Sequence, residues 1–547
     1  MKNIAGFVLK AGGIPLLLYL FGSPEHRAET GFVPVLGYLL IVFGLSGMFL
    51  AELQLLRFGS GVNHFNAKAY RLAEVGFYAR NRHPFSWFFI IYNLGIFLVM
   101  TPFNLHYAGI WLGTTVLILL HLILIQEKQL SGVLGEQYRN YQERVPLWFW
   151  RIRLEDSERV KFLPMLMWVI GRTVFRFWYR IRVTGQENIP RTKPFIIVSN
   201  HESYLDPFLF GIYVPYEIQF VTTADIFTSP LIRLILKGIG TFPMRRHRQD
   251  LKSIRTMLRM INSGQTVCIF PEGGRSFTGA PLPIVNETLK LIQKCEVPIL
   301  PIHTQGAYEI WPRWAPNRRR GRFTAEIKPV IEPAAQADLE KLRTLIQSAI
   351  FQEKKSYPPV KSRQIVRGLD KFLWACSHCK ARNSIQVITG SAIQCNQCGS
   401  RWEMRPDYSL NRQGSNEYST LIDWMDDIES SIHEHPLASH TLRLDRSELP
   451  YLETPIESYQ TDDGIEITDD LKLALTNKRF ILRQNDLEIE NWALELITVL
   501  TVDFSHGFSM GFSGIRHRFI LPQQELPSKW DSYYKVLRTK LDSESTI

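Results

Sequence analysis

The sequence predicts a multidomain chain with four parts: an apolar helical block, an α/β domain with a mostly parallel sheet, a small module with four cysteines, and a β-rich C-terminal domain. Three observations predict this order. Long apolar stretches are confined to the first 150 residues, and short apolar runs then alternate with helical patterns. Two Cys-x-x-Cys pairs follow, and they precede a final series of strand patterns. A chain of 547 residues has room for three or four domains of ordinary size.

The net charge indicates the kind of partner, and the cysteines indicate the redox compartment. The formal net charge of +11 favours an anionic partner, which is either nucleic acid or a phospholipid surface. The strongly apolar N-terminus favours membrane phospholipids, so we expect no nucleic-acid partner. Four of the six cysteines form two close pairs, which suits metal binding in a reducing compartment better than a disulfide framework. The sequence leaves the oligomeric state unknown.

The N-terminal block, residues 1–155, is predicted to cross a bilayer four times. Each of its apolar stretches approaches the roughly 20 residues that span hydrocarbon. The stretches are Ile4–Phe21, Phe32–Leu56, Phe85–Phe103 and Tyr107–Ile125. Lysine and arginine crowd the segment between the second and third stretches and the region after the fourth. The positive-inside rule therefore predicts a multi-pass membrane protein whose catalytic and C-terminal domains lie in the cytoplasm.

Two strings in this block contain candidate site residues. Gly76–Pro84, and Glu127 after the last apolar stretch, resemble the isoprenylcysteine and phospholipid methyltransferase family of small membrane enzymes. The resemblance implies that Arg82, His83 and Glu127 help to hold S-adenosylmethionine. Two positions depart from the family pattern: Ser86 and Gln126. A methyltransferase-like block that serves only as a membrane anchor is therefore an alternative.

Residues 156–360 are predicted to form the α/β domain. It would begin with an amphipathic basic helix near 160–180 that lies at a headgroup surface. Strands are predicted at Phe195–Ser199, Ile218–Thr222, Thr266–Phe270 and Ile299–Ile302, and helices at 205–213, 229–239, 249–262 and 286–294. Such alternation argues for a largely parallel sheet, whose active groups belong at the carboxyl ends of the strands.

The string Asn200–Asp206 follows the first of these strands and contains a histidine and a carboxylate. His201 and Asp206 are five positions apart, which on a regular helix would separate them by about 140° and keep them from touching. They must therefore straddle a turn or a helix start, and Asp206-Pro207 suits a helix start. Asp206 could then accept from one imidazole nitrogen and leave the other as a base.

The string Phe270–Ser276 follows the third predicted strand. Gly273 and Gly274 would present backbone amides, and Arg275 offers a planar fork that matches phosphate. Glu272 is interpreted as a hydrogen-bonding organiser of this loop.

The frame Asn-His-x-Ser-x-x-Asp, followed by Phe-Pro-Glu-Gly-x-Arg-Ser, resembles the glycerolipid acyltransferase family of the 1-acylglycerol-3-phosphate type. The resemblance implies that His201 deprotonates the hydroxyl of a glycerol-based acceptor, which then attacks an acyl thioester. Asp206 would orient His201, and coenzyme A or an acyl carrier protein would deliver the acyl group. The residues assigned to the acceptor's phosphate are Arg246, Glu272, Gly273, Gly274 and Arg275.

The four paired cysteines predict a metal site. Cys376 and Cys379 are followed, after fifteen residues, by Cys395 and Cys398. Four thiolates suit tetrahedral zinc, so residues 370–405 are predicted to form a zinc ribbon. Because four sulfur ligands leave no open position, the zinc would be structural. A redox dithiol is the other interpretation, although duplication of the pair argues against it.

The remaining sequence predicts a linker and a last domain. Residues 406–445 are polar and are interpreted as a linker. Residues 446–547 show alternating strand patterns and a final helix near Trp530–Leu541, and Leu473–Phe480 resembles the pleckstrin-homology/GRAM-type fold. A plain β-rich interaction domain is the alternative.

The leading hypothesis is a membrane-bound enzyme that acylates a lysophospholipid-like acceptor. The second is a bifunctional enzyme that also transfers a methyl group. The third is a non-catalytic membrane scaffold, against which the intact residues His201, Asp206, Glu272 and Arg275 speak.

Overall fold

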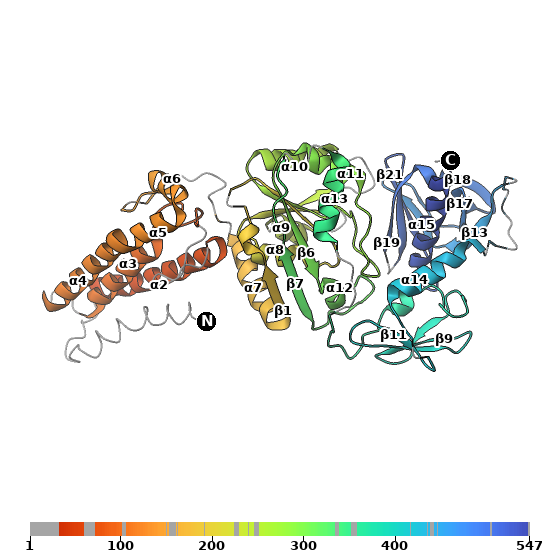
Figure 1. Cartoon of the computed structure of the whole chain (residues 1–547), viewed down its shortest axis with the longest axis horizontal. Coiled ribbons are helices and arrows are strands. Elements are labelled where there is room, and N and C mark those ends of the chain that lie inside the picture. The colour runs from red at the N-terminus through yellow and green to blue at the C-terminus, as the bar shows by residue number, and fades with distance from the viewer. Residues whose placement is uncertain are drawn as a thin grey trace. The chain divides into compact units, whose positions relative to one another are not determined.

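The computed structural model describes most of residues 32–544 (Figure 1). The exceptions within that range are 60–71, 101–104, 149, 153–159, 161, 191, 224–228, 239, 245–250, 334–337, 352–357, 416, 435, 438–441, 443, 446 and 504–505. The chain forms two compact units, Met1–Leu166 with Val214–Glu217, and Met167–Tyr213 with Ile218–Ile547. The first expected membrane span, Ile4–Phe21, lies outside the described residues.

Helices are the regular elements of the first unit among its described residues. Its helices are α2 (Phe32–Phe58), α3 (Pro84–Met100), α4 (Leu105–His121), the π-helix Leu122–Gln126, α5 (Glu127–Leu134) and α6 (Glu136–Arg144). Val33–Phe58 and Trp111–Leu134 are long and apolar enough to cross a membrane, whereas the apolar helix Pro84–Val99 is shorter. Helices α2 and α3 pack closely, since a Cβ at Gly44 would lie 2.7 Å from the Cβ of Tyr92. Small residues at such a crossing are typical of membrane helix pairs.

A seven-stranded mixed sheet forms the centre of the second unit, among its described residues. In the order β1-β7-β6-β2-β5-β3-β4, the neighbours pair in parallel except β6 and β7. The strands are β1 (Arg180–Thr184), β2 (Ile196–Ser199), β3 (Ile218–Thr223), β4 (Thr241–Met244), β5 (Thr266–Ile269), β6 (Ile299–Gln305) and β7 (Arg322–Ile327). The expectation of an α/β domain with a mostly parallel sheet is confirmed.

Helices alternate with these strands as the periodicity predicts. They are α7 (Phe162–Trp178), α8 (Asp206–Tyr213), α9 (Pro230–Gly238), α10 (Leu251–Asn262), α11 (Asn286–Lys294), α12 (Ala307–Ile310) and α13 (Leu339–Ile350). Figure 1 shows α10, α11 and α13 together beside the sheet, and they share one apolar core with β2, β5 and β6. Strands β2 and β5 are buried along their whole length, as in parallel sheets covered on both faces.

The four-cysteine module is a small antiparallel sheet in the order β12-β11-β10-β9-β8, counted over the part of the chain that is described. The strands are β8 (Ile385–Val387), β9 (Ala392–Cys395), β10 (Arg401–Met404), β11 (Leu410–Arg412) and β12 (Tyr418–Ser419).

The prediction that residues 406–445 form a linker is wrong for the described part of this range. It contains β11, β12 and the helix α14 (Leu421–Ser430), which begins with a capping box between Thr420 and Asp423. Trp424 of this helix is buried and donates from Nε1 to the carbonyl of Ala375, at 3.0 Å. The polar composition was misleading because Asp423, Asp426 and Asp427 occupy the exposed face of an amphipathic helix, while the apolar residues recur at helical spacing.

The C-terminal domain has two antiparallel sheets in its described residues, in the orders β13-β16-β17-β18 and β15-β14-β21-β20-β19. Its strands are β13 (Pro450–Ile456), β14 (Ser458–Thr461), β15 (Glu466–Ile467), β16 (Leu471–Thr476), β17 (Arg479–Gln484), β18 (Leu487–Ala493), β19 (Ile497–Asp503), β20 (Gly507–Phe512) and β21 (Ile515–Ile520). The helix α15 (Pro527–Glu544) follows. Two sheets and one helix agree with a β-rich domain, and the pleckstrin-homology-like assignment stays a prediction.

One apolar cluster joins the parts of the second unit. It includes Tyr308 near α12, Trp374 before the cysteines, Trp424 of α14, and Phe480 and Trp530 of the C-terminal domain. The α/β domain, the four-cysteine module and the last domain therefore share a continuous core.

Candidate active site

Two sequence motifs meet at the carboxyl edge of the central sheet. Strands β2 and β5 are adjacent and parallel, with Val198 opposite Ile269, so the segments that follow them emerge side by side. One segment contains His201 and the other Glu272. The backbone N–H of His201 donates to Glu272 Oε1 at 2.7 Å, which joins the two motifs directly.

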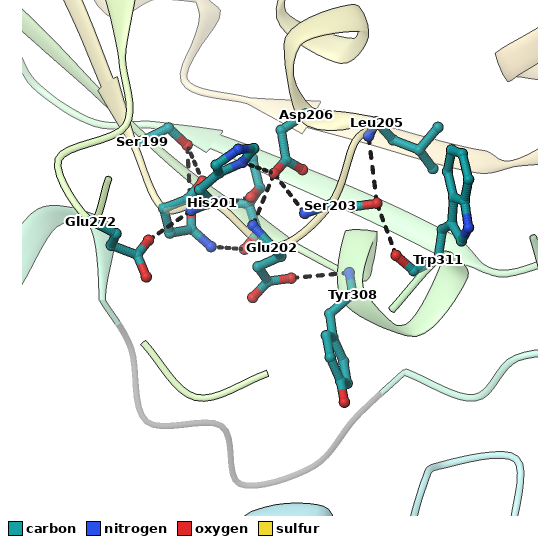
Figure 2. A network of polar contacts seen from close by, with 11 residues as sticks. Ser199, His201, Glu202, Ser203, Leu205, Asp206, Glu272, Tyr308 and Trp311 are labelled. Carbon is teal, nitrogen blue, oxygen red and sulfur yellow. Dashed lines mark hydrogen bonds and ion pairs between the residues drawn. The ribbon is translucent and has the colours of Figure 1, made fainter. Parts of the chain in front are cut away.

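His201 and Asp206 form a hydrogen-bonded pair (Figure 2). His201 Nδ1 lies 2.9 Å from Asp206 Oδ2. The Asp206 carboxylate is fully buried, and 15% of the His201 side chain is exposed. The imidazole stacks on Phe270, with ring centroids 4.0 Å apart and an angle of 19° between the planes. The ring is thus held on its face by Phe270 and at Nδ1 by Asp206, which directs Nε2 away from the carboxylate.

The turn before α8 makes this contact possible. Helix α8 begins at Asp206, as expected, with Pro207 next. The backbone N–H groups of Glu202 and Ser203 both donate to Asp206 Oδ2, at 2.9 Å each. Asp206 therefore holds the preceding loop together, and the histidine lies on that loop.

Several residues that support this loop were not assigned a role from the sequence. Asn200 Oδ1 accepts the backbone N–H of Thr304 at 2.8 Å, and Asn200 Nδ2 donates to the Thr304 carbonyl at 2.9 Å. Ser203 Oγ donates to the carbonyl of Trp311, at 3.1 Å. Only Asn200 and Ser203 belong to the motif, and their partners lie more than 100 positions away. Sequence reasoning had no signal for those partners.

Glu272 lies across His201 from Asp206 in Figure 2. Its Oε1 accepts from His201, and its Oε2 accepts the backbone N–H of Leu282 at 2.7 Å. Burial raises the pKa of Glu272 to about 8, against the lowering effect of these two hydrogen bonds. Backbone donors contact both oxygens, which agrees with the interpretation of Glu272 as an organiser of the loop.

The glycine-rich turn and Arg275 follow Glu272. Gly273 has a positive φ of 65°, which favours glycine at this position. The Arg275 guanidinium carbon lies 3.3 Å from the centroid of the Tyr204 ring, next to the histidine loop. Burial lowers the pKa of Arg275. The structure thus brings Arg275 beside His201, whereas the expected phosphate ligand Arg246 lies outside the described residues.

The three residues that were predicted to hold S-adenosylmethionine also come together. Arg82 Nη1 lies 2.7 Å from Glu127 Oε2, and His83 Nε2 lies 2.6 Å from Glu127 Oε1. Tyr138 donates to Oε1 at 2.7 Å and Gln142 to Oε2 at 2.6 Å, two contacts that sequence reasoning missed. Side chains of the protein therefore contact both carboxylate oxygens of Glu127.

The four paired cysteines converge on one point. Their Sγ atoms all lie within 4.8 Å of one another, with Cys376 and Cys398 3.9 Å apart and Cys379 and Cys395 3.7 Å apart. A tetrahedral zinc ion with Zn–S bonds of about 2.3 Å requires sulfur–sulfur distances of about 3.8 Å. The donor set and its spacing fit such an ion.

The central domain is similar to known proteins. Residues 180–305 match the family model described as Acyltransferase. The 1-acyl-sn-glycerol-3-phosphate acyltransferase of Bacillus subtilis is 28% identical over 165 residues, which cover 30% of this chain and 77% of that protein. The chloroplastic enzyme of the same name from Brassica napus is 29% identical over 164 residues, 29% of this chain and 47% of that one. The crystal structure of a 1-acyl-sn-glycerophosphate acyltransferase from Thermotoga maritima is 24% identical, with a TM-score of 0.32, and the match covers 34% of this chain and 76% of that one.

The N-terminal block has a separate match. Residues 8–145 match the model of a protein family of unknown function, DUF1295.

The match to the acyltransferases spans both motifs of the central domain. The chain is therefore an enzyme with an acyltransferase domain of the 1-acylglycerol-3-phosphate acyltransferase type.

Proposed function

We propose that the central domain transfers an acyl chain from a thioester to the free hydroxyl of a lysophospholipid, with His201 as the general base. The observation that carries this proposal is the His201–Asp206 pair, held beside a glycine-rich turn and Arg275 at one edge of the sheet. The similarity to lysophospholipid acyltransferases supports the same reaction class.

The geometry supports a direct transfer. His201 Nε2 takes the proton of the acceptor hydroxyl, whose oxygen attacks the thioester carbonyl. A carbon–oxygen bond forms and the carbon–sulfur bond breaks, and the proton passes from His201 to the departing thiolate. Asp206 fixes the tautomer by accepting from Nδ1 and stabilises the imidazolium. Arg275 and the amides of the Gly273–Gly274 turn bind the acceptor's phosphate, together with Arg246.

Membrane attachment supports this choice of substrate. The apolar helices α2 and Trp111–Leu134 would anchor the enzyme where lysophospholipids reside. We propose a multi-pass anchor, with the catalytic and C-terminal domains on the cytoplasmic side. Cys376, Cys379, Cys395 and Cys398 would hold a zinc ion, which would have a structural role because no coordination position is left open.

The direct test is an assay with the purified full chain in phospholipid vesicles. Lysophosphatidic acid is offered with acyl-coenzyme A or with acyl carrier protein, and the products are identified by mass spectrometry. We expect phosphatidic acid to form with one of the two donors. Absence of acylated product with both donors, and with other lysophospholipids, would refute the proposal. Monoacylglycerol serves as the control acceptor, because it has a free hydroxyl but no phosphate.

The convergence of Arg82 and His83 on Glu127 favours a second candidate function, binding of S-adenosylmethionine by the N-terminal block. We expect the full chain to bind radiolabelled S-adenosylmethionine and the variant Glu127→Gln to lose that binding. A wild-type chain that binds none at millimolar ligand would leave the block as a membrane anchor. Binding that Glu127→Gln retains would contradict the assigned site.

A further inference from the structure

The loop that follows Arg275 is tied to the catalytic histidine. The backbone N–H of Ser276 donates to the carbonyl of His201 at 3.3 Å, and Ser276 Oγ accepts the N–H of Gly279 at 2.8 Å. Gly279 has a φ of +89°, and a Cβ there would lie 3.0 Å from the ring of Tyr308. The loop is therefore tightly packed, and we expect a displacement of one loop residue to displace the residues next to it.

Phe277 of this loop contacts residues that lie far along the chain. Its ring stacks on Phe372, with centroids 5.9 Å apart and an angle of 19° between the planes. The Arg313 guanidinium carbon lies 3.9 Å from the centroid of the Phe277 ring, and Lys535 Nζ lies 5.8 Å from it. The Tyr308 hydroxyl donates to the Phe277 carbonyl at 2.9 Å.

Phe372 and Lys535 come from separate parts of the chain beyond the α/β domain, and Arg313 of the α/β domain contacts a third part. Phe372 lies just before the first cysteine pair, and Lys535 belongs to α15, where it pairs with Asp531 at 2.6 Å. Arg313 Nη2 donates to the carbonyl of Val502, on β19, at 2.8 Å. Two C-terminal segments therefore contact the ring directly, and a third, β19, contacts Arg313, whose guanidinium lies over the ring. The ring is two positions away from Arg275.

We propose that Phe277 and Arg313 are positioning residues for the acceptor-binding loop, so that the C-terminal half of the chain sets the place of Arg275 at the acceptor's phosphate. This inference rests on the proposed acyl transfer. Phe277 acts through Arg275 and Ser276 and does not touch the reacting atoms. The C-terminal domain would then contribute to the acceptor site although it is a separate domain. A misplacement of about 1 Å can cost up to about 10²-fold in catalytic efficiency, so a tenfold effect from a smaller shift of the phosphate contact is expected.

The test compares two acceptors in the full-length enzyme, lysophosphatidic acid and monoacylglycerol. For Phe277→Leu and Arg313→Met we expect the KM for lysophosphatidic acid to rise about tenfold. The kcat, the KM for the acyl donor and the KM for monoacylglycerol should change less than about twofold, because only the phosphate contact is misplaced. Arg313→Lys, which restores a cation over the ring, should recover part of the affinity. Lys535→Met should act in the same direction more weakly, and its half-exposed side chain makes it a variant that we expect to fold.

Arg479→Met is the matched control. Arg479 belongs to the same C-terminal domain and pairs with Glu448, far along the chain from the loop. Unchanged KM values in the active Phe277, Arg313 and Lys535 variants would overturn the inference while leaving the proposed function intact. Equal losses with both acceptors, or the same loss in Arg479→Met, would show a general structural role and would also overturn it. A wild type that acylates neither acceptor would refute the proposed function itself.

Discussion

Replacing His201 by alanine in the full-length enzyme is expected to lower the kcat of acyl transfer by about 10²–10⁴-fold, the usual contribution of a general base. The acceptor hydroxyl then has no group to take its proton as it attacks the thioester. The change removes a side chain that is partly exposed at the end of β2, so the fold should persist. Thermal unfolding within a few degrees of the wild type would verify that the loss is chemical.

Asp206→Asn sharpens this prediction. An asparagine in place of the buried carboxylate carries no negative charge to stabilise the imidazolium, so we expect the kcat to fall while the KM for the acceptor changes little. His506→Ala provides the control, because His506 is an exposed histidine of the C-terminal domain. If His201→Ala acylated lysophosphatidic acid at the wild-type rate, His201 would not be the base.

Loss of metal from the four-cysteine site is expected to have the largest effect on stability. We expect one zinc per chain, and we expect a chelator or Cys395→Ser to lower the unfolding temperature by more than about 10 °C. Structural zinc contributes about 10–16 kcal/mol of binding free energy in small peptides, and 1 kcal/mol corresponds to a few degrees in a domain of this size. Cys376 and Cys395 are fully buried in the shared core, so their environment cannot relax without disturbing Trp374 and Trp402.

Elemental analysis and calorimetry measure these two quantities. Cys295→Ala is the control, since Cys295 is a lone, partly buried cysteine of the α/β domain and should change neither. A purified protein without zinc, whose unfolding temperature is insensitive to chelators, would contradict a metal site. Detection of two disulfides in place of four thiols would favour the redox interpretation.

The local pattern of the sequence was sufficient for the framework of the catalytic domain. Strands β2, β3, β5 and β6 and helices α8 to α11 lie within a few residues of their expected positions. Each is a short apolar run or an amphipathic period bounded by turn residues, which neighbours in the sequence specify. The same reasoning predicted that a turn must bring His201 to Asp206, and the structure contains that turn.

Composition failed where it was averaged over a segment. Residues 421–430 look like a polar linker when their acidic side chains are counted, but Leu421, Trp424 and Ile428 recur at helical spacing and are buried. In the C-terminal domain, strand β18 has mostly exposed side chains, so no buried apolar face defines it. Its place is decided by pairing with β17.

The sequence by itself thus determined which chemical groups the candidate sites offer: a histidine and a carboxylate across a turn, a glycine-rich loop with an arginine, and four thiols at metal-ligand spacing. Only the tertiary structure decided which partners hold them. Glu272 turns both oxygens to backbone donors, Arg275 lies over Tyr204, and Phe277 contacts the C-terminal half. The physical reason is distance along the chain. Motifs are short-range patterns set by local backbone chemistry, whereas these contacts join segments up to about 260 positions apart that meet only when the sheet and the shared core have formed.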